Sequence, residues 1–156
     1  MITVRPARVS ERRSVVALGT AAFAPFGDYR SSLTSWTSNP AMQTLVAVGP
    51  AGGCLGFAVV ALVQAPGGTR AHLLAVGVAE DQRGRGIGGR LLDAALDLAR
   101  REALPWGAEH LQLEVAADNT AARALFASRG FRVSPVASPA YDGGRAALTL
   151  AAPLTR

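Results

Sequence analysis

The residues best suited to chemistry form a glycine-rich run in the middle of the chain. Its members are Arg83, Gly84, Arg85, Gly86, Ile87, Gly88 and Gly89. Glycines leave the backbone free of Cβ atoms, so several N–H groups can converge on one anion. A helical pattern starts at Ile87, and the first N–H groups of a helix lack intrahelical partners and lie at the positive end of its dipole. We therefore expect a pyrophosphate site here, with the two arginines adding positive charge.

The same glycines permit two other interpretations. Gly84, Gly86 and Gly89 match G-x-G-x-x-G, the pattern of a dinucleotide-binding turn. Against that reading, the run lies mid-chain, four polar residues (80–83) separate it from the preceding strand, and too few residues follow for a doubly wound sheet. The second alternative is that the glycines only turn a corner.

Cysteine and histidine offer little further chemistry. A single cysteine, Cys54, excludes an internal disulfide and a cysteine-based zinc cluster. It starts an apolar strand pattern with no histidine nearby in sequence, so we expect a buried thiol and not a nucleophile. The two histidines, His72 and His110, lie far apart in sequence, and no metal site is expected.

The elements that must position the glycine run alternate between helix and strand. Hydrophobic periodicity predicts strands near residues 2–5, 43–48, 54–64, 70–78, 111–115, 131–137 and 145–151, and helices over 11–22, 29–37, 87–103 and 119–129. Ser10 and Asn119 are the predicted caps of the first and last helices, and Gly130 is the predicted stop. The prediction is an α/β fold with a mixed, mostly antiparallel sheet, in which the helix at 87–103 joins two parallel strands as a right-handed crossover.

Length and composition fit one globular domain over residues 1–156. The chain is 49 % hydrophobic and carries a net charge of +5, and all sixteen of its cationic residues are arginine. These arginines are spread along the chain without interleaved aromatic residues, which favours a small polyphosphate ligand over nucleic acid. The start of the chain lacks a signal-peptide pattern, and no apolar stretch reaches 18 residues. We expect no membrane span and a cytoplasmic location.

Two segments together resemble the GNAT acyltransferase superfamily. Arg83, Gly86 and Gly88 meet that family's (Q/R)-x-x-G-x-(G/A) signature, and L-E-V-A-A-D-N-T-A-A-R-A-L-F-A-S-R-G-F at 113–131 is similar to its second signature. The spacing of the two segments and the order of the elements also fit. The second segment is closest to the bacterial ribosomal-protein N-terminal acetyltransferases.

The resemblance implies acetyl-CoA bound where strands 70–78 and 111–115 splay apart. The backbone of Val76, Gly77 and Val78 would then pair with the pantetheine arm as an added strand does. The N–H groups of residues 84–89 would hold the pyrophosphate, and Asn119 would contact the pantetheine arm or the cofactor tail. Without the family, Asn119 is simply a helix cap, and both roles are compatible.

The resemblance also suggests catalytic residues. Glu114 occupies the position of the base in the N-terminal acetyltransferases, although a solvent-facing glutamate would fit the strand pattern equally well. His72, on the other splayed strand, is the second candidate, because imidazole exchanges protons near neutral pH. Phe126 stands where the family usually has a tyrosine that protonates the departing thiolate. Tyr141, in the turn before the last strand, is a candidate replacement.

The leading hypothesis is therefore an N-acetyltransferase acting by direct attack on a small-molecule amine or a protein N-terminus. The acceptor is expected to contact Phe23, Phe26, Asp28, Tyr29 and the turn around Tyr141. Because Phe126 replaces the tyrosine, a non-catalytic acyl-CoA-binding module is the alternative, and a nucleotide-binding oxidoreductase fragment is the third hypothesis. The terminal strand at 145–151 would permit pairing in a homodimer.

Overall fold

One mixed β-sheet organises the protein. The computed structural model describes the backbone of residues 1–134, 140–142 and 145–155, and the side chains of 1–134 and 146–155. Within these residues eight strands form a sheet in the order β1-β2-β3-β4-β5-β8-β6, with β7 also paired to β8. The strands are β1 (Thr3–Pro6), β2 (Met42–Val48), β3 (Cys54–Ala65), β4 (Gly68–Val78), β5 (His110–Ala116), β6 (Arg132–Val133), β7 (Ala140–Asp142) and β8 (Arg145–Pro153).

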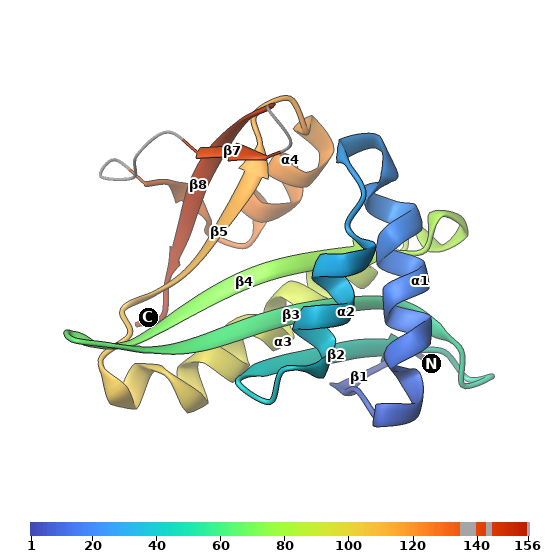
Figure 1. Cartoon of the computed structure of the whole chain (residues 1–156), viewed down its shortest axis with the longest axis horizontal. Helices are drawn as coiled ribbons and strands as arrows, with labels where there is room; N and C mark the ends of the chain where they lie inside the picture. The colour runs from blue at the N-terminus through green and yellow to red at the C-terminus, as the bar shows by residue number, and fades with distance from the viewer. Residues whose placement is uncertain (135–139, 143–144, 156) are drawn as a thin grey trace.

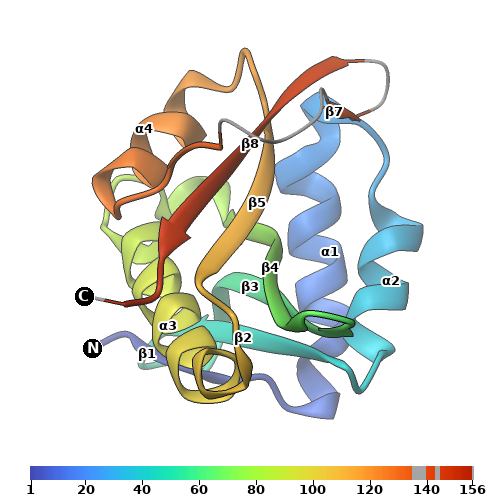
Figure 2. The same cartoon turned by 90° about the vertical axis from the view of Figure 1, so that its left-hand side faces the viewer.

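In the described part of the chain, four α-helices cover the two faces of the sheet. They are α1 (Arg12–Phe23), α2 (Arg30–Ser38), α3 (Ile87–Glu102) and α4 (Thr120–Ser128). Helices α3 and α4 lie on one face, and α1 and α2 lie on the other (Figure 2). The apolar residues of α3 recur at helical spacing, and Leu91, Leu92, Ala95 and Ala99 are fully buried against the sheet. The face under α1 and α2 has a separate buried cluster, which is centred on Val15, Leu33 and Phe57.

Among the strands that the structure describes, one pair is parallel, and its two strands separate after two residues. β4 and β5 are joined through α3 and pair in register at Ala71–Leu111 and His72–Gln112 alone. Beyond that point β4 stays with β3, whereas β5 continues with β8 along its whole length. Figure 1 shows the two strands diverging from a shared end. The predicted splay between strands 70–78 and 111–115 is therefore confirmed.

A β-bulge in β4 reverses the alternation of its side chains between the two faces of the sheet. Val59 of β3 pairs with Ala75, but Val60 pairs with Leu73, so Leu74 is an extra residue. Leu73 joins the core under α3, whereas Leu74 and Ala75 both pack toward α1 and α2. Bulges bend a strand and increase its twist. This bend occurs where β4 leaves β5.

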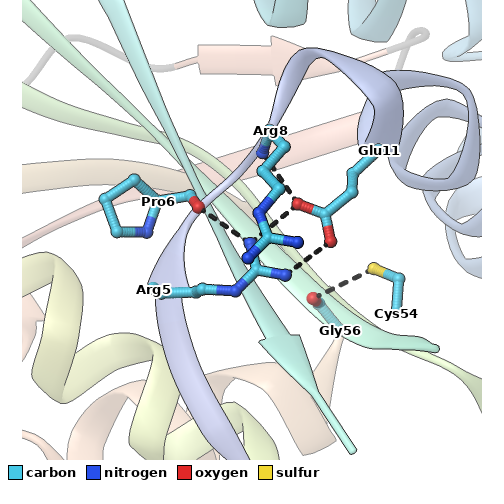
Figure 3. Close-up of polar contacts among 6 residues, drawn as sticks. All are labelled: Arg5, Pro6, Arg8, Glu11, Cys54 and Gly56. Carbon is cyan, nitrogen blue, oxygen red and sulfur yellow. Dashed lines mark hydrogen bonds and ion pairs between the residues drawn. The ribbon is translucent and has the colours of Figure 1, made fainter. Parts of the chain in front are cut away.

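An ion pair joins the N-terminal strand β1 to the segment that precedes α1 (Figure 3). Both guanidinium Nη atoms of Arg5 donate to the two carboxylate oxygens of Glu11 at 2.8 Å. The backbone N–H of Arg8 also donates to Glu11 Oε1, at 2.7 Å. These bonds lower the pKa of Glu11 to about 2. The predicted cap at Ser10 is wrong: a 3₁₀ turn at Val9–Glu11 precedes α1, whose N-cap position is Glu11, and that cap has no side-chain hydrogen bond.

Most predicted elements are confirmed to within one or two residues, but the C-terminal part differs. The strand expected at 131–137 is observed only at Arg132–Val133, and residues 135–139 lie outside the described part. Strand β7, which was not predicted, lies within the expected turn and pairs with β8. Among the described residues, no helix combines the length and apolar character needed to cross a membrane.

Candidate active site

A cavity of about 600 Å³ occupies the gap between β4 and β5. It is lined from both faces of the sheet. Phe23, Tyr29 and Trp36 contribute from the α1–α2 side, and Gly88, Leu125 and Phe126 contribute from the α3–α4 side. The cavity therefore passes through the sheet at the split, so a molecule bound under α3 and α4 can meet one bound under α1 and α2.

The two predicted bases form one pair at the edge of this cavity. His72 Nε2 lies 2.6 Å from Glu114 Oε2, and the two side chains are 30 % and 40 % exposed. His72 is paired in register with Gln112, and Glu114 lies two residues further along β5 on the same face, so the two are diagonal neighbours. A carboxylate can only accept hydrogen bonds, so with Glu114 ionised the imidazole donates from Nε2. Sequence reasoning named both residues but not their contact.

The four glycines of the turn form two pairs, and the structure requires glycine at each pair for a different reason. Gly84 and Gly86 each have a φ of +80°, which L side chains rarely adopt, and open space lies around both. Gly88 and Gly89 instead lie in the first turn of α3, where a Cβ would meet Leu125 of α4 and the guanidinium of Arg129, the residue that follows α4. The first pair therefore shapes the loop, and the second allows α4 to pack closely against α3.

The arginines near this turn are engaged differently. Arg85 Nη1 donates to the Gln82 side-chain oxygen at 2.8 Å, and both Arg83 and Arg85 are exposed beside the turn. Arg90 is directed away from the turn, because its Nη1 donates to the Ile2 carbonyl oxygen at 2.6 Å. The positive charge available at the loop therefore comes from Arg83 and Arg85.

The end of β4 presents alternate residues to the cavity. Val76 and Val78 line it, whereas Gly77 faces the other cluster, where a Cβ would lie 2.7 Å from the Phe57 ring. Val78 pairs with Gly56 of β3. Because β5 has already separated, the opposite backbone edge of this stretch borders the cavity. Ile87 is buried in the core, so only its backbone is near the turn.

Three further predicted residues belong to the C-terminal half. Asn119 lines the cavity and also caps α4, since its Oδ1 accepts from the Ala122 N–H at 3.2 Å. Phe126 lines the cavity and packs edge-on against Phe131, with ring centroids 5.8 Å apart. Tyr141 lies on β7 paired with Ala146, but its side chain is outside the described part of the structure.

The residues expected to contact the acceptor lie partly in the cavity. Phe23, Phe26 and Tyr29 line the cavity, but Asp28 does not, and its Oδ1 accepts from the Arg30 N–H at 3.1 Å. Sequence reasoning missed several lining residues, namely Ser32, Trp36, Leu74, Ala122 and Leu125. The helical spacing of Tyr29, Ser32 and Trp36 could have indicated a shared helix face.

Cys54 lies outside the cavity lining and is half-buried. Its Sγ lies 3.5 Å from the Gly56 carbonyl oxygen, and burial raises the pKa of the thiol. A thiol with a raised pKa is a poor nucleophile. Among the described residues, no three histidine, cysteine or acidic side chains gather as metal ligands would.

Comparison with known proteins agrees with this geometry. Residues 14–131 match the acetyltransferase (GNAT) family. The ribosomal-protein-S18-alanine N-acetyltransferase of Escherichia coli is similar in structure, with a TM-score of 0.78 and 24 % identity over 100 % of this chain and 96 % of that one. NAA60 of Arabidopsis thaliana in complex with acetyl-CoA is also similar, with a TM-score of 0.81 and 19 % identity over 100 % of both chains. The IAA acetyltransferase of Bacillus cereus has a TM-score of 0.73 and 19 % identity over 98 % of this chain and 99 % of that one. No curated protein matches the sequence significantly.

The mixed sheet splits between β4 and β5, and a glycine turn precedes the first turn of α3. Together these features define an acyltransferase class of fold. The match covers most of the chain, and the protein belongs to the acetyltransferase (GNAT) family. The protein is therefore an acetyltransferase, and the oxidoreductase interpretation of the glycine run is wrong.

Proposed function

We propose that the protein transfers an acetyl group from acetyl-CoA to a primary amine, either of a small molecule or of a protein N-terminus. The observation that carries this proposal is the hydrogen bond between His72 and Glu114 at the edge of a cavity that crosses the sheet. It combines a proton acceptor with a passage between two substrate compartments. Direct transfer needs both features.

The side of the cavity under α3 and α4 suits acetyl-CoA. The loop at Gly84 and Gly86 and the first N–H groups of α3, which have no partner within the helix, would hold the pyrophosphate, assisted by Arg83 and Arg85. The edge of β4 at Val76–Val78 has lost its parallel neighbour, so its backbone is available to the amide-containing pantetheine arm. Asn119 and Phe126 border the same space.

The reaction needs no covalent intermediate on the protein. The amine nitrogen forms a bond to the acetyl carbon, the C–S bond breaks, and the sulfur leaves as a thiolate. Most amines are protonated near pH 7, so the ammonium must lose one proton before it can attack, and Glu114, oriented by its hydrogen bond to His72, is the proposed acceptor of that proton. The attacking nitrogen loses a second proton to water as the amide forms.

The thiolate has no acidic partner at the position of Phe126. Phe126 is 5 % exposed and carries no proton to donate. Water or Tyr141 is the proposed proton source. A thiolate leaves without full protonation, so transfer can continue with a slower final proton step.

The Phe126 position also favours the second candidate, a module that binds acyl-CoA without catalysis. The direct test incubates the protein with acetyl-CoA and a panel of amines while released thiol is measured. Thiol release that depends on the amine and is lost in Glu114→Gln supports the enzyme. Tight acetyl-CoA binding without any amine-dependent thiol release would support the module.

The single domain, the cytoplasmic location and the homodimer stay predictions.

A further inference from the structure

The end of the cavity under α1 and α2 is aromatic. Phe23, Phe26, Tyr29 and Trp36 line it, and the Phe23 and Tyr29 rings meet edge-on with centroids 5.4 Å apart. Phe23 also packs against the buried Phe57 ring, at 6.1 Å. These contacts hold the rings in place, so this end presents a fixed apolar wall and not a loose surface.

Charge at this end is scarce. Among the described residues that line the cavity, Glu114 is the only acid, and its carboxylate is already hydrogen-bonded to His72. Ser32 is a small neutral polar residue on the α2 side. Asp28 is close in sequence but does not line the cavity. The described residues therefore give the compartment one negative charge, at the place where the amine must react.

This distribution discriminates between acceptors. One ammonium group can approach Glu114, and an aromatic or aliphatic body beside it removes apolar surface from water on both partners. A second or third ammonium group would be desolvated against aromatic rings without a carboxylate partner, which is unfavourable even where a ring face offers some cation–π attraction. The site therefore favours acceptors with one charge and an apolar body.

We propose that the acceptor is an amine with a single positive charge whose nitrogen is attached to a large apolar or aromatic group. This inference rests on the proposed acetyl transfer. Two sources share the chemistry, namely a free arylalkylamine and the first residue of a peptide with a large apolar side chain. Polyamines and other polycations are excluded by the same argument.

The experiment compares kcat/KM for four acceptors at saturating acetyl-CoA. They are 2-phenylethylamine, spermidine, and two otherwise identical peptides that begin with phenylalanine or with serine. We expect 2-phenylethylamine or the phenylalanine peptide to exceed spermidine and the serine peptide by tenfold or more. The arm that responds identifies the source of the amine.

Two variants test the wall itself. Trp36→Ala should raise KM for the preferred acceptor about tenfold with a smaller change in kcat, whereas Trp106→Ala should change neither, because Trp106 is 70 % exposed and lies outside the cavity lining. If Trp36→Ala does not fold, Ser32→Asp provides the test, since an added carboxylate should raise the activity toward spermidine. Both variants of the cavity leave the acetyl-CoA side intact, so their acetyl-CoA affinity should equal that of the wild type.

The outcomes separate the two proposals. Equal or greater activity with spermidine in the wild type overturns the acceptor class while acetyl transfer stands. Unchanged KM in a folded Trp36→Ala, or no gain for spermidine in Ser32→Asp, also contradicts it. Acetyl-CoA binding with no thiol release for any amine overturns the proposed function, and the acceptor class falls with it.

Discussion

A carboxylate and an imidazole 2.6 Å apart concentrate the proposed proton chemistry on two residues. His72 and Glu114 come from strands that pair at only two positions, and their contact lies just beyond the second. The pair joins the two strands where the cavity begins. Because each side chain orients the other, we expect them to act as a unit and not as independent bases.

Glu114→Gln should lower kcat about 100-fold or more, because it removes the proton acceptor while keeping the shape of the side chain. His72→Phe should lower kcat less. The double variant should have nearly the same kcat as Glu114→Gln, because the effects of residues that act as a unit do not add. Steady-state kinetics at saturating acetyl-CoA measure all three. Glu109→Gln is the matched control, because Glu109 is an exposed acid outside the cavity lining. If the losses of the two single variants add fully in the double variant, His72 and Glu114 act independently.

Phe126→Tyr should raise kcat about tenfold, because the ring lines the cavity and a hydroxyl on it could protonate the leaving thiolate. Phe131→Tyr adds the same hydroxyl to the neighbouring ring, which is not part of the lining, and should not raise kcat. Rates of thiol release give the comparison. An unchanged kcat in a folded Phe126→Tyr would mean that another group already supplies the proton.

Among the elements, β4 and the turn that follows it do the most to build the site. The bulge at Leu74 lets one strand serve both faces: His72 faces α1 and α2, whereas Val76 and Val78 beyond the bulge border the cavity and pack with the α3 core. The strand then passes through a short 3₁₀ turn, Glu80–Gln82, into the glycine loop and α3. His72, the partner of the proposed proton acceptor, and the anion loop are thereby fixed on one continuous segment.

Gly86→Val should weaken coenzyme A binding at least tenfold, because φ at this position is +80° and a β-branched residue would distort the loop. The matched control is Gly52→Val, in the turn between β2 and β3, where φ is +86° and the space is equally open. Both variants should lose about 1–2 kcal/mol of stability from the same strain, but only Gly86→Val should lose affinity. Calorimetric titration with coenzyme A and thermal unfolding measure the two effects. Equal affinities in the two variants would place the anion elsewhere.

At the scale of the whole molecule, the layers on the two faces of the sheet are tied together at the N-terminus. The Arg5–Glu11 ion pair joins the edge strand β1 to the segment that leads into α1, and the two side chains are 25 % and 15 % exposed. Arg90 of α3 reaches Ile2 from the other face. The start of the chain is therefore held by contacts with both layers.

Glu11→Gln should destabilise the fold by about 1 kcal/mol at pH 7, because the charge-assisted bonds are lost. The pKa of Glu11 is about 2, against an ordinary value of 4.5, so the wild-type contribution is complete above about pH 4.5 and disappears as the pH falls toward 2. The difference between the two proteins should shrink over that interval, as measured by urea unfolding at several pH values. Asp97→Asn, which breaks an exposed pair within α3, should change stability much less. A pH-independent difference would show that the effect is not ionic.

The local sequence determined much of this protein. Apolar spacing located the four helices and the long strands, Asn119 was recognised as the cap of α4, and Gly84 and Gly86 marked the loop before α3, because each of these features depends on neighbours a few residues apart. Strand alternation also placed Glu114 on the face opposite Leu111 and Leu113.

Only the tertiary structure decided the rest. The contact of His72 with Glu114 spans 42 residues of chain and depends on the register of β4 and β5, in which His72 pairs with Gln112. The sequence places Gly88 and Gly89 in the anion loop, yet the close approach of Leu125 of α4 and of Arg129, just after α4, explains them. The aromatic wall combines residues of α1, of α2 and of the segment between them, and these face the cavity only after both helices dock on the sheet. Local propensity cannot encode such contacts, because they form between segments that are distant until the core is buried.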